Sequence, residues 1–313
     1  MTVHETGYQP YSGGRLGPLR RMLAITGVGI RIGLRRRFLV TAMLMAVPMT
    51  FMFGVLFYIA ADNPGQFVER ARLFFTPEEW HQELGGSGYE TLSPSDKLGT
   101  LWSVLLSRHL YYQMLWVLVV IPWVGPSLLA DDFQSRALTI YFSKPITRFE
   151  YLLGKWMVLG FFVGCVTAVP STLLYIASIL MCRDLEVLWR TAYLVPAAWF
   201  VSLLVAVTGG LMMMAFSAAG RSRRFAALGW LMTVMGSWVV ATAVELAPRE
   251  HAPTWVKVLS FKHNVDLVTR SVFGVMVQPI DVSVFWSLGM LLAVGMVSGL
   301  YLWRRVHTVE GLR

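Results

Sequence analysis

The sequence predicts an all-α protein that crosses a membrane six times. Hydrophobic residues make up 56% of its 313 positions and charged residues 14%, and the mean hydropathy is +0.57. A soluble domain has about one quarter charged residues and could not bury so much apolar surface. Apolar stretches of the length needed to cross a bilayer recur along the chain. The six expected spans are residues 38–60, 110–130, 151–181, 191–219, 225–246 and 282–303.

The distribution of charge predicts the orientation of these spans. Segments on the side of the two termini hold 17 Lys and Arg against 5 Asp and Glu, whereas the other side holds 10 and 13. Because cytosolic segments carry an excess of Lys and Arg, both termini are expected in the cytosol and the protein in the inner (plasma) membrane. A net charge of +9 can indicate nucleic-acid binding. Here the surplus of positive charge lies on one side of the membrane, which is the pattern that fixes topology and not the pattern of a nucleic-acid-binding surface. No nucleic-acid partner is therefore expected.

Residues 1–37 are predicted to form a cytosolic tail followed by an amphipathic helix on the inner leaflet. Between residues 15 and 37, several apolar residues share one side of a helical wheel and several arginines share the other. Such a helix lies in the bilayer interface with its guanidinium groups near anionic lipid. The alternative is a basic flank that only fixes the topology. The arginines expected at the membrane surface are Arg20, Arg21, Arg31, Arg35 and Arg36.

Two segments, 61–109 and 247–281, are expected on the outer side, and residues 304–313 form a cytosolic tail. Ser93-Pro94 resembles a helix start that could run on into the membrane. Segment 247–281 is too polar to cross a bilayer and too apolar for an ordinary loop, so we expect two short amphipathic pieces around Lys262-His263-Asn264. They either re-enter the outer leaflet or rest on the headgroups. Histidines such as His109 are assigned outside, and no metal site is expected.

Two small-residue motifs could let helices approach closely. They are Gly160-x-x-x-Gly164 in the third expected span and Gly295-x-x-x-Gly299 in the sixth. Packing within one chain and a seam between two copies are both compatible with these motifs.

Residues 131–150, which we name the charged connection, join the second and third spans and are the strongest functional candidate. Thr147 and Glu150 have the spacing of a capping box, and Lys144 before Pro145 favours a sharp corner. A link that served only topology would need fewer acidic residues, whereas a docking surface for another protein explains both signs of charge. The candidate docking residues are Asp131, Asp132, Phe133, Arg136, Leu138, Lys144, Pro145, Arg148 and Glu150.

The charged connection also carries motifs of a known family. Asp131-Asp132 follows a span, and Arg136-Ala137-Leu138, Lys144-Pro145-Ile146-Thr147-Arg148 and Gly154-Lys155 come after it. These motifs and the six-span layout resemble the ABC-2-type permeases, the membrane subunits of ATP-driven exporters. The resemblance implies that 131–150 docks on a separate ATP-binding subunit. It further implies a second permease copy, identical or different, a lipophilic or amphipathic cargo, and re-entrant outer helices before the last span.

The chain itself is not expected to be an enzyme. A phosphate-binding loop needs Gly-x-x-x-x-Gly-Lys-Ser/Thr, but the one Gly-Lys pair, Gly154-Lys155, precedes Trp156. ATP and Mg are therefore expected on the partner subunit, with no catalytic residue and no cofactor in this chain. Ion-coupled carriers usually hold charged groups at mid-membrane, and the expected spans are nearly free of them. The alternative function is a membrane anchor that relays ATPase motion to a periplasmic accessory protein without transport.

Overall fold

The computed structural model describes residues 17–70, 83–84, 89, 91–135, 137–138, 146–182, 185–220, 222–246, 254–275 and 282–308. Within these residues all the regular secondary structure is helical, and six helical stretches are long and apolar enough to cross a membrane. The prediction of an all-α, multi-pass membrane protein is confirmed. The six candidate spans are Arg37–Asp62, Pro94–Gln134, Arg148–Cys182, Glu186–Ala219, Arg223–Val244 and Val284–His307.

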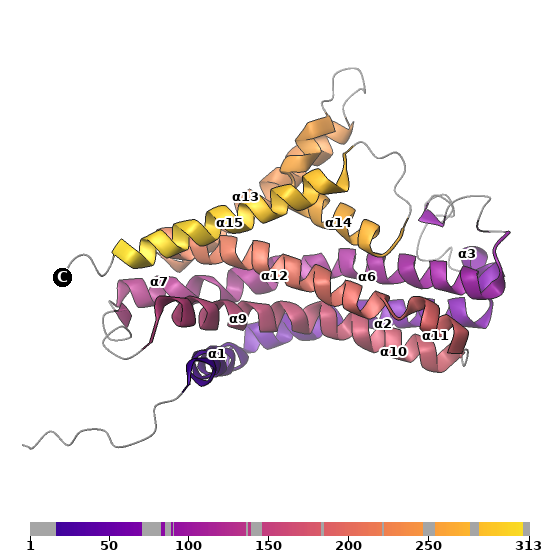
Figure 1. Ribbon diagram of the computed structural model, residues 1–313, viewed down its shortest axis with the longest axis horizontal. Coiled ribbons are helices and arrows are strands. Elements are labelled where there is room, and N and C mark those ends of the chain that lie inside the picture. The colour runs from indigo at the N-terminus through magenta and orange to yellow at the C-terminus, as the bar shows by residue number, and fades with distance from the viewer. Residues whose placement is uncertain are drawn as a thin grey trace, which may run out of the picture.

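The long helices lie side by side, with α12 (Leu194–Ala219) in the middle of the bundle (Figure 1). It contacts α9 (Arg148–Val166), α10 (Ala168–Cys182), α13 (Arg223–Leu246) and α15 (Val284–Thr308). α12 is apolar around its whole circumference, and most of its residues are buried, although Trp199, Phe200 and Leu203 are exposed. By contrast α13 and α15 bury little of their surface and expose many large apolar side chains, as helices facing lipid do.

Helix α1 (Pro18–Leu34) runs across the bundle. In Figure 1 the long helices run horizontally, whereas α1 is seen nearly end-on. It packs on α9 through glycines. A Cβ atom at Gly33 would lie 2.5 Å from Cζ of Phe162, and one at Gly29 would lie 2.5 Å from Cγ2 of Val158. Because these positions carry no side chain, the two helix backbones approach closely. The apolar strip that includes Leu19 stays exposed, where an interfacial helix would meet lipid.

Helix α6 (Pro94–Val124) packs on α2 (Arg37–Asp62) and begins earlier than the expected second span. Ser93 caps it by accepting a hydrogen bond from the backbone N–H of Asp96, which confirms the helix start proposed from Ser93-Pro94. The helix extends before residue 110, and every residue from 101 to 107 is buried, so this stretch packs against the protein on all sides. His109 is buried as well and therefore lies in the protein interior instead of an outer segment.

The second and third spans each contain a break. After Gly125 the chain continues as α7 (Pro126–Gln134), and a Cβ atom at Gly125 would overlap Cγ of Met213 on α12. The expected continuous span 151–181 is instead divided into α9 and α10 at Thr167. Pro170 explains this break, because a proline ring clashes with the carbonyl group four residues earlier in a continuous helix.

The end of the bundle opposite the C-terminus holds η1 (Pro64–Gln66), α3 (Phe67–Arg70) and α11 (Leu185–Thr191) (Figure 1). Two short pieces precede the last span, as the sequence predicts: η3 (Thr254–Leu259) and α14 (Phe261–Val272). Their break lies at Ser260, which caps α14, and not at residues 262–264. The Ser260 hydroxyl accepts a hydrogen bond from the His263 N–H at 3.3 Å and so caps the helix. The break between the two pieces therefore comes two residues before residue 262, where the expected break begins.

Helix α14 lies among the long helices rather than beyond their ends. At one end of α14, the Tyr193 hydroxyl donates to the carbonyl oxygen of Phe273 at 3.2 Å, beside the start of α12. At the other end, the Phe261 ring lies 3.4 Å from the place of a Cβ atom at Gly209. Gly209 is about 22 Å along α12 from Leu194, at about 1.5 Å per residue. The first turn of α14 therefore reaches the level of the middle of the bundle.

Candidate functional site

The charged connection lies at the bundle end that also holds α1 and the end of α15 (Figure 1). The end of α7 supplies Asp131, Asp132 and Phe133, and the start of α9 supplies Arg148 and Glu150. Leu138 is buried. Three of the predicted docking residues, Arg136, Lys144 and Pro145, lie outside the described residues.

Asp132 is bound within its own chain. Its Oδ2 atom accepts a hydrogen bond from the Tyr151 hydroxyl at 2.6 Å and lies 2.7 Å from Nζ of Lys155. Tyr151 and Lys155 are one turn apart on α9 and therefore share a face of that helix. The Asp132 and Lys155 side chains are each only 14% exposed, so the pair is largely shielded from water. This carboxylate fastens the end of α7 to α9.

Glu150 joins the start of α9 to α1. Its Oε2 atom accepts the Thr147 backbone N–H at 2.8 Å, and the Thr147 hydroxyl accepts the Glu150 N–H at 3.2 Å. These two bonds confirm the predicted capping box. The Oε1 atom of Glu150 forms an ion pair with Arg21 at 2.9 Å. Arg21 was expected at the membrane surface, but this contact turns its guanidinium group toward the protein.

The other predicted membrane-surface arginines differ in their surroundings. Arg20 and Arg31 are exposed on α1, and Arg35, which follows its last residue, is exposed too. Arg36 is half-buried, and its guanidinium group donates to the carbonyl oxygen of Trp123 at 3.4 Å. The three exposed arginines are the ones whose charge can reach a lipid headgroup.

Asp131 forms a second, more exposed contact between helices. Its two carboxylate oxygens accept hydrogen bonds from Nε and Nη2 of Arg223 at 2.6 and 2.5 Å. Arg223 is the first residue of α13, so this planar pair links α7 to the fifth candidate span. The Ser217 hydroxyl holds α7 from the side of α12: it donates to the Pro126 carbonyl oxygen at 2.8 Å and accepts the Ala130 N–H at 3.0 Å.

The end of α15 closes the site. Arg148 contacts the ring of His307, and the guanidinium carbon of Arg305 lies 5.8 Å from the centre of the Phe133 ring, within cation–π range. The described part of the charged connection thus touches α1, α9, α13 and α15. The surface that it leaves exposed is formed by Gln134, Ser135, Thr147 and Phe149.

Sequence reasoning identified the acidic residues of this site but not their partners. Lys155 offered one signal, because a lone cation just inside a span that follows an acidic connection can reach back to it. No local pattern relates Asp131 to Arg223, which lie far apart in the chain and are brought together by the packing of α7 and α13 against α12.

The predicted small-residue motifs have different surroundings in the structure. A Cβ atom at Gly160 or Gly164 would meet no atom within 4 Å, whereas one at Gly295 or Gly299 would contact α12 at 3.8 and 4.0 Å. The two glycines of the third-span motif therefore leave open space beside them within the described residues. It remains available as a predicted seam with another copy or with lipid.

A buried polar cluster joins the second candidate span to the first and third. His109 Nδ1 lies 3.1 Å from the Ser171 hydroxyl, and Gln113 Nε2 lies 3.0 Å from His109 Nε2 and 2.9 Å from the Thr50 hydroxyl. Ser171 donates to the carbonyl oxygen of Thr167, so its oxygen accepts a hydrogen bond from His109 Nδ1–H. His109 Nε2 is then the acceptor for Gln113. The sequence analysis placed this histidine outside the membrane and missed the cluster.

On the side of the bundle's middle away from the charged connection, a second ion cluster surrounds Glu83. Its carboxylate lies 2.5 Å from Nε of Arg108 on α6 and 2.8 Å from Nη1 of Arg270 on α14. Arg270 also pairs with Asp266 at 3.0 Å. Glu83 belongs to the predicted outer segment 61–109, so these bonds hold that segment against both helices.

Comparison with known proteins adds no family to these observations. No protein-family model and no curated protein matches this chain. Six candidate spans in an all-helical chain decide the broad class. It is a multi-pass membrane protein. In the described residues no group of three His, Cys, Asp or Glu side chains could hold a metal ion.

Proposed function

We propose that this chain is the membrane-spanning permease subunit of an ATP-driven transporter of the ABC-2 type. A separate ATP-binding subunit, which holds ATP and Mg, docks on the charged connection 131–150. A second permease copy completes the pathway, and the complex exports a lipophilic or amphipathic substrate across the inner membrane. Both termini face the cytosol in this arrangement.

The observation that carries the proposal is the way the charged connection is fastened. Asp132 binds α9, Glu150 binds α1, and Asp131 binds α13. A flexible link would absorb a force applied to it, whereas a link held to three helices transmits that force into the spans. The bracing therefore suits a segment that receives motion from an ATPase.

The same bracing revises which residues would contact the partner. The described acidic residues are engaged within the chain, so the docking contact is assigned to the exposed surface of Gln134, Ser135, Thr147 and Phe149. Phe149 is 60% exposed although it lies beside the capped turn of α9. Exposed aromatic side chains are common anchors of protein interfaces. Arg136, Lys144 and Pro145 remain predicted docking residues.

Cysteine labelling tests the orientation on which the proposal depends. In a variant with Cys165 and Cys182 replaced by alanine, we would introduce either Ser135→Cys in the charged connection or Ser283→Cys at the start of the last span. A membrane-impermeant maleimide added to intact cells should label Ser283→Cys, and should label Ser135→Cys only after the membrane is permeabilised. The reverse pattern would place the charged connection outside and end the proposal.

Co-purification tests the docking surface. The tagged chain should retain a protein that contains a Gly-x-x-x-x-Gly-Lys-Ser/Thr loop, and Phe149→Asp should reduce the amount retained and the associated ATPase activity at least tenfold. Trp189→Asp is the matched control, because Trp189 is an 82% exposed aromatic residue on α11 at the other end of the bundle. An equal effect of the two substitutions, or no effect of either, would contradict docking at the charged connection.

One observation favours the alternative of a mechanical relay without transport. The cluster of Glu83, Arg108 and Arg270 ties the outer segment to α6 and α14, so motion of those helices would move the outer surface. A relay requires a stable periplasmic partner and an ATPase activity that no cargo stimulates. A transporter requires an ATPase activity that rises when cargo is added.

A further inference from the structure

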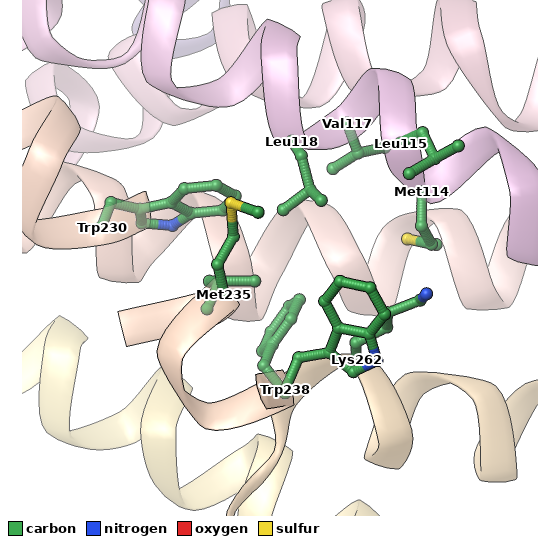
Figure 2. Close-up of a pocket in the computed structure, with 10 residues that line it drawn as sticks. Met114, Leu115, Val117, Leu118, Trp230, Met235, Trp238 and Lys262 are labelled. Atoms are coloured by element: carbon green, nitrogen blue, oxygen red, sulfur yellow. The ribbon is translucent and has the colours of Figure 1, made fainter. Parts of the chain in front are cut away.

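A pocket lies between α6, α13 and α14, and its lining is apolar except at one end. Met114 and Leu118 of α6 face Trp230 and Met235 of α13 across it (Figure 2). Lys262, the second residue of α14, lies at the end near Met114, and Trp230 lies at the opposite end (Figure 2). The pocket therefore presents a cation at one end and a row of apolar side chains leading away from it.

Aromatic groups surround the Lys262 ammonium. Its Nζ atom donates to the Tyr111 hydroxyl at 3.0 Å and lies 4.4 Å from the centre of the Tyr111 ring and 4.2 Å from the Trp238 ring. No carboxylate pairs with it in the part of the chain that the structure describes. Arg270 on the same helix differs, because it has both Asp266 and Glu83 as partners. Two ring faces and one hydroxyl contact the ammonium, and among the described residues its positive charge has no countercharge.

Lys262 also lies deep in the bundle. The adjacent Phe261 packs near Gly209, about 22 Å along α12 from Leu194 and past the midpoint of that helix. A cation at this depth is costly and marks a functional site unless a partner compensates it. The first turn of α14 adds to the positive potential, because the N-terminal end of a helix attracts anions and repels cations.

We propose that this pocket binds an anionic amphiphile. The Lys262 ammonium holds the negative head group, and the alkyl chain lies along Met114, Leu118 and Met235 toward Trp230. If the bound amphiphile is the transported cargo, this inference rests on the proposed transport function. Binding of the amphiphile to the pocket does not depend on transport and can be measured with this chain alone. Fatty-acid-like amphiphiles and acidic phospholipids share this chemistry, because both have a negative head group and at least one alkyl chain.

Tryptophan quenching by matched bromoalkyl probes tests the charge requirement. The purified chain in phosphatidylcholine nanodiscs would be titrated with 11-bromoundecanoate and, separately, with the neutral 11-bromoundecanol. Trp230 and Trp238 line the pocket, so a bromine atom bound there quenches them. We expect saturable quenching by the carboxylate with a Kd at least tenfold lower than that of the alcohol.

Substitution of the lysine tests the site itself. Lys262→Gln should raise the Kd for 11-bromoundecanoate at least tenfold and leave that for the alcohol unchanged, and Lys262→Arg should retain binding. Lys257→Gln on η3 is the control, because it removes the same charge from a residue that does not line the pocket. Leu115→Phe, which fills the lipid-facing side of the pocket, should weaken both probes while Lys262 is intact.

Further measurements distinguish a membrane lipid from a single-chain amphiphile as the ligand, and they distinguish failure of the pocket inference from failure of the proposed transport function. Phosphatidylglycerol in the nanodiscs should displace the probe if a membrane lipid occupies the site, and should leave binding unchanged if the ligand is a single-chain amphiphile. Equal binding of the acid and the alcohol, or equal binding by wild type and Lys262→Gln, would overturn the proposal. Loss of ATPase association would refute the proposed function without affecting this measurement.

Discussion

An exchange of the charges of Asp132 and Lys155 tests whether the charged connection is braced from within. Asp132→Lys alone would place two ammonium groups where the structure has a 2.7 Å ion pair, and Lys155→Asp would place two carboxylates there. Breaking a buried pair by changing one partner costs about 3–5 kcal/mol of unfolding free energy. Because both side chains are only 14% exposed, we expect each single change to cost about 3 kcal/mol.

The double exchange should recover most of this stability. It restores opposite charges at the same place, and the Tyr151 hydroxyl can accept a hydrogen bond from a lysine as well as donate one to a carboxylate. We therefore expect the exchanged protein to lie within about 1 kcal/mol of the wild type, a strong departure from additivity. The unfolding free energy would be measured in detergent micelles by titration with sodium dodecyl sulfate, followed by tryptophan fluorescence.

The neighbouring ion pair provides the control. Asp131 and Arg223 have side chains that are 35% and 57% exposed, so solvent screens their interaction and Asp131→Lys should cost no more than about 1 kcal/mol. If the double exchange at Asp132 and Lys155 is as unstable as the sum of the single changes, the bracing is refuted. If it regains stability but not association with the ATPase, Asp132 itself belongs to the docking surface.

Two further predictions concern helix packing and the outer cluster. Gly33→Ala should lower the unfolding free energy of the protein by about 1–3 kcal/mol, because its Cβ atom would lie 2.5 Å from the Phe162 ring. Gly160→Ala places its Cβ atom in open space, so it should leave the unfolding free energy unchanged or raise it by up to about 1 kcal/mol. Thermal unfolding of the two variants side by side checks this, and equal melting temperatures would contradict the close approach of α1 and α9. Glu83→Gln should cost about 3 kcal/mol in the same assay, because Arg108 and Arg270 would both lose a buried carboxylate. Glu186→Gln, a change in an exposed acid paired with Arg190, serves as the control and should have no measurable effect.

Local chemistry determined much of the fold. Inside a bilayer each backbone N–H and C=O must be satisfied within the segment, so six long apolar stretches imply six helices wherever they pack. The helix start at Ser93 and the capping box of Thr147 and Glu150 depend only on residues a few positions apart. The expected second span began only at residue 110, although the helix start at Ser93-Pro94 was predicted and α6 runs without a break from there to Val124. The burial of residues 101–107 on all sides depends on neighbouring helices and is not visible in the local sequence.

The tertiary structure decided what the charged residues do. From the sequence, Asp131, Asp132 and Glu150 could have been solvated or could have docked directly on a partner, whereas the fold pairs them with Arg223, Lys155 and Arg21.

The fold also moves Lys262 from an expected outer segment to the middle of the bundle, where α14 enters between α6 and α13. These pairings depend on the rotation and depth of each helix, which side-chain packing sets. Contacts such as that of Gly33 with Phe162 bring residues together across the bundle, and hydrophobic periodicity along a single helix contains no information about them.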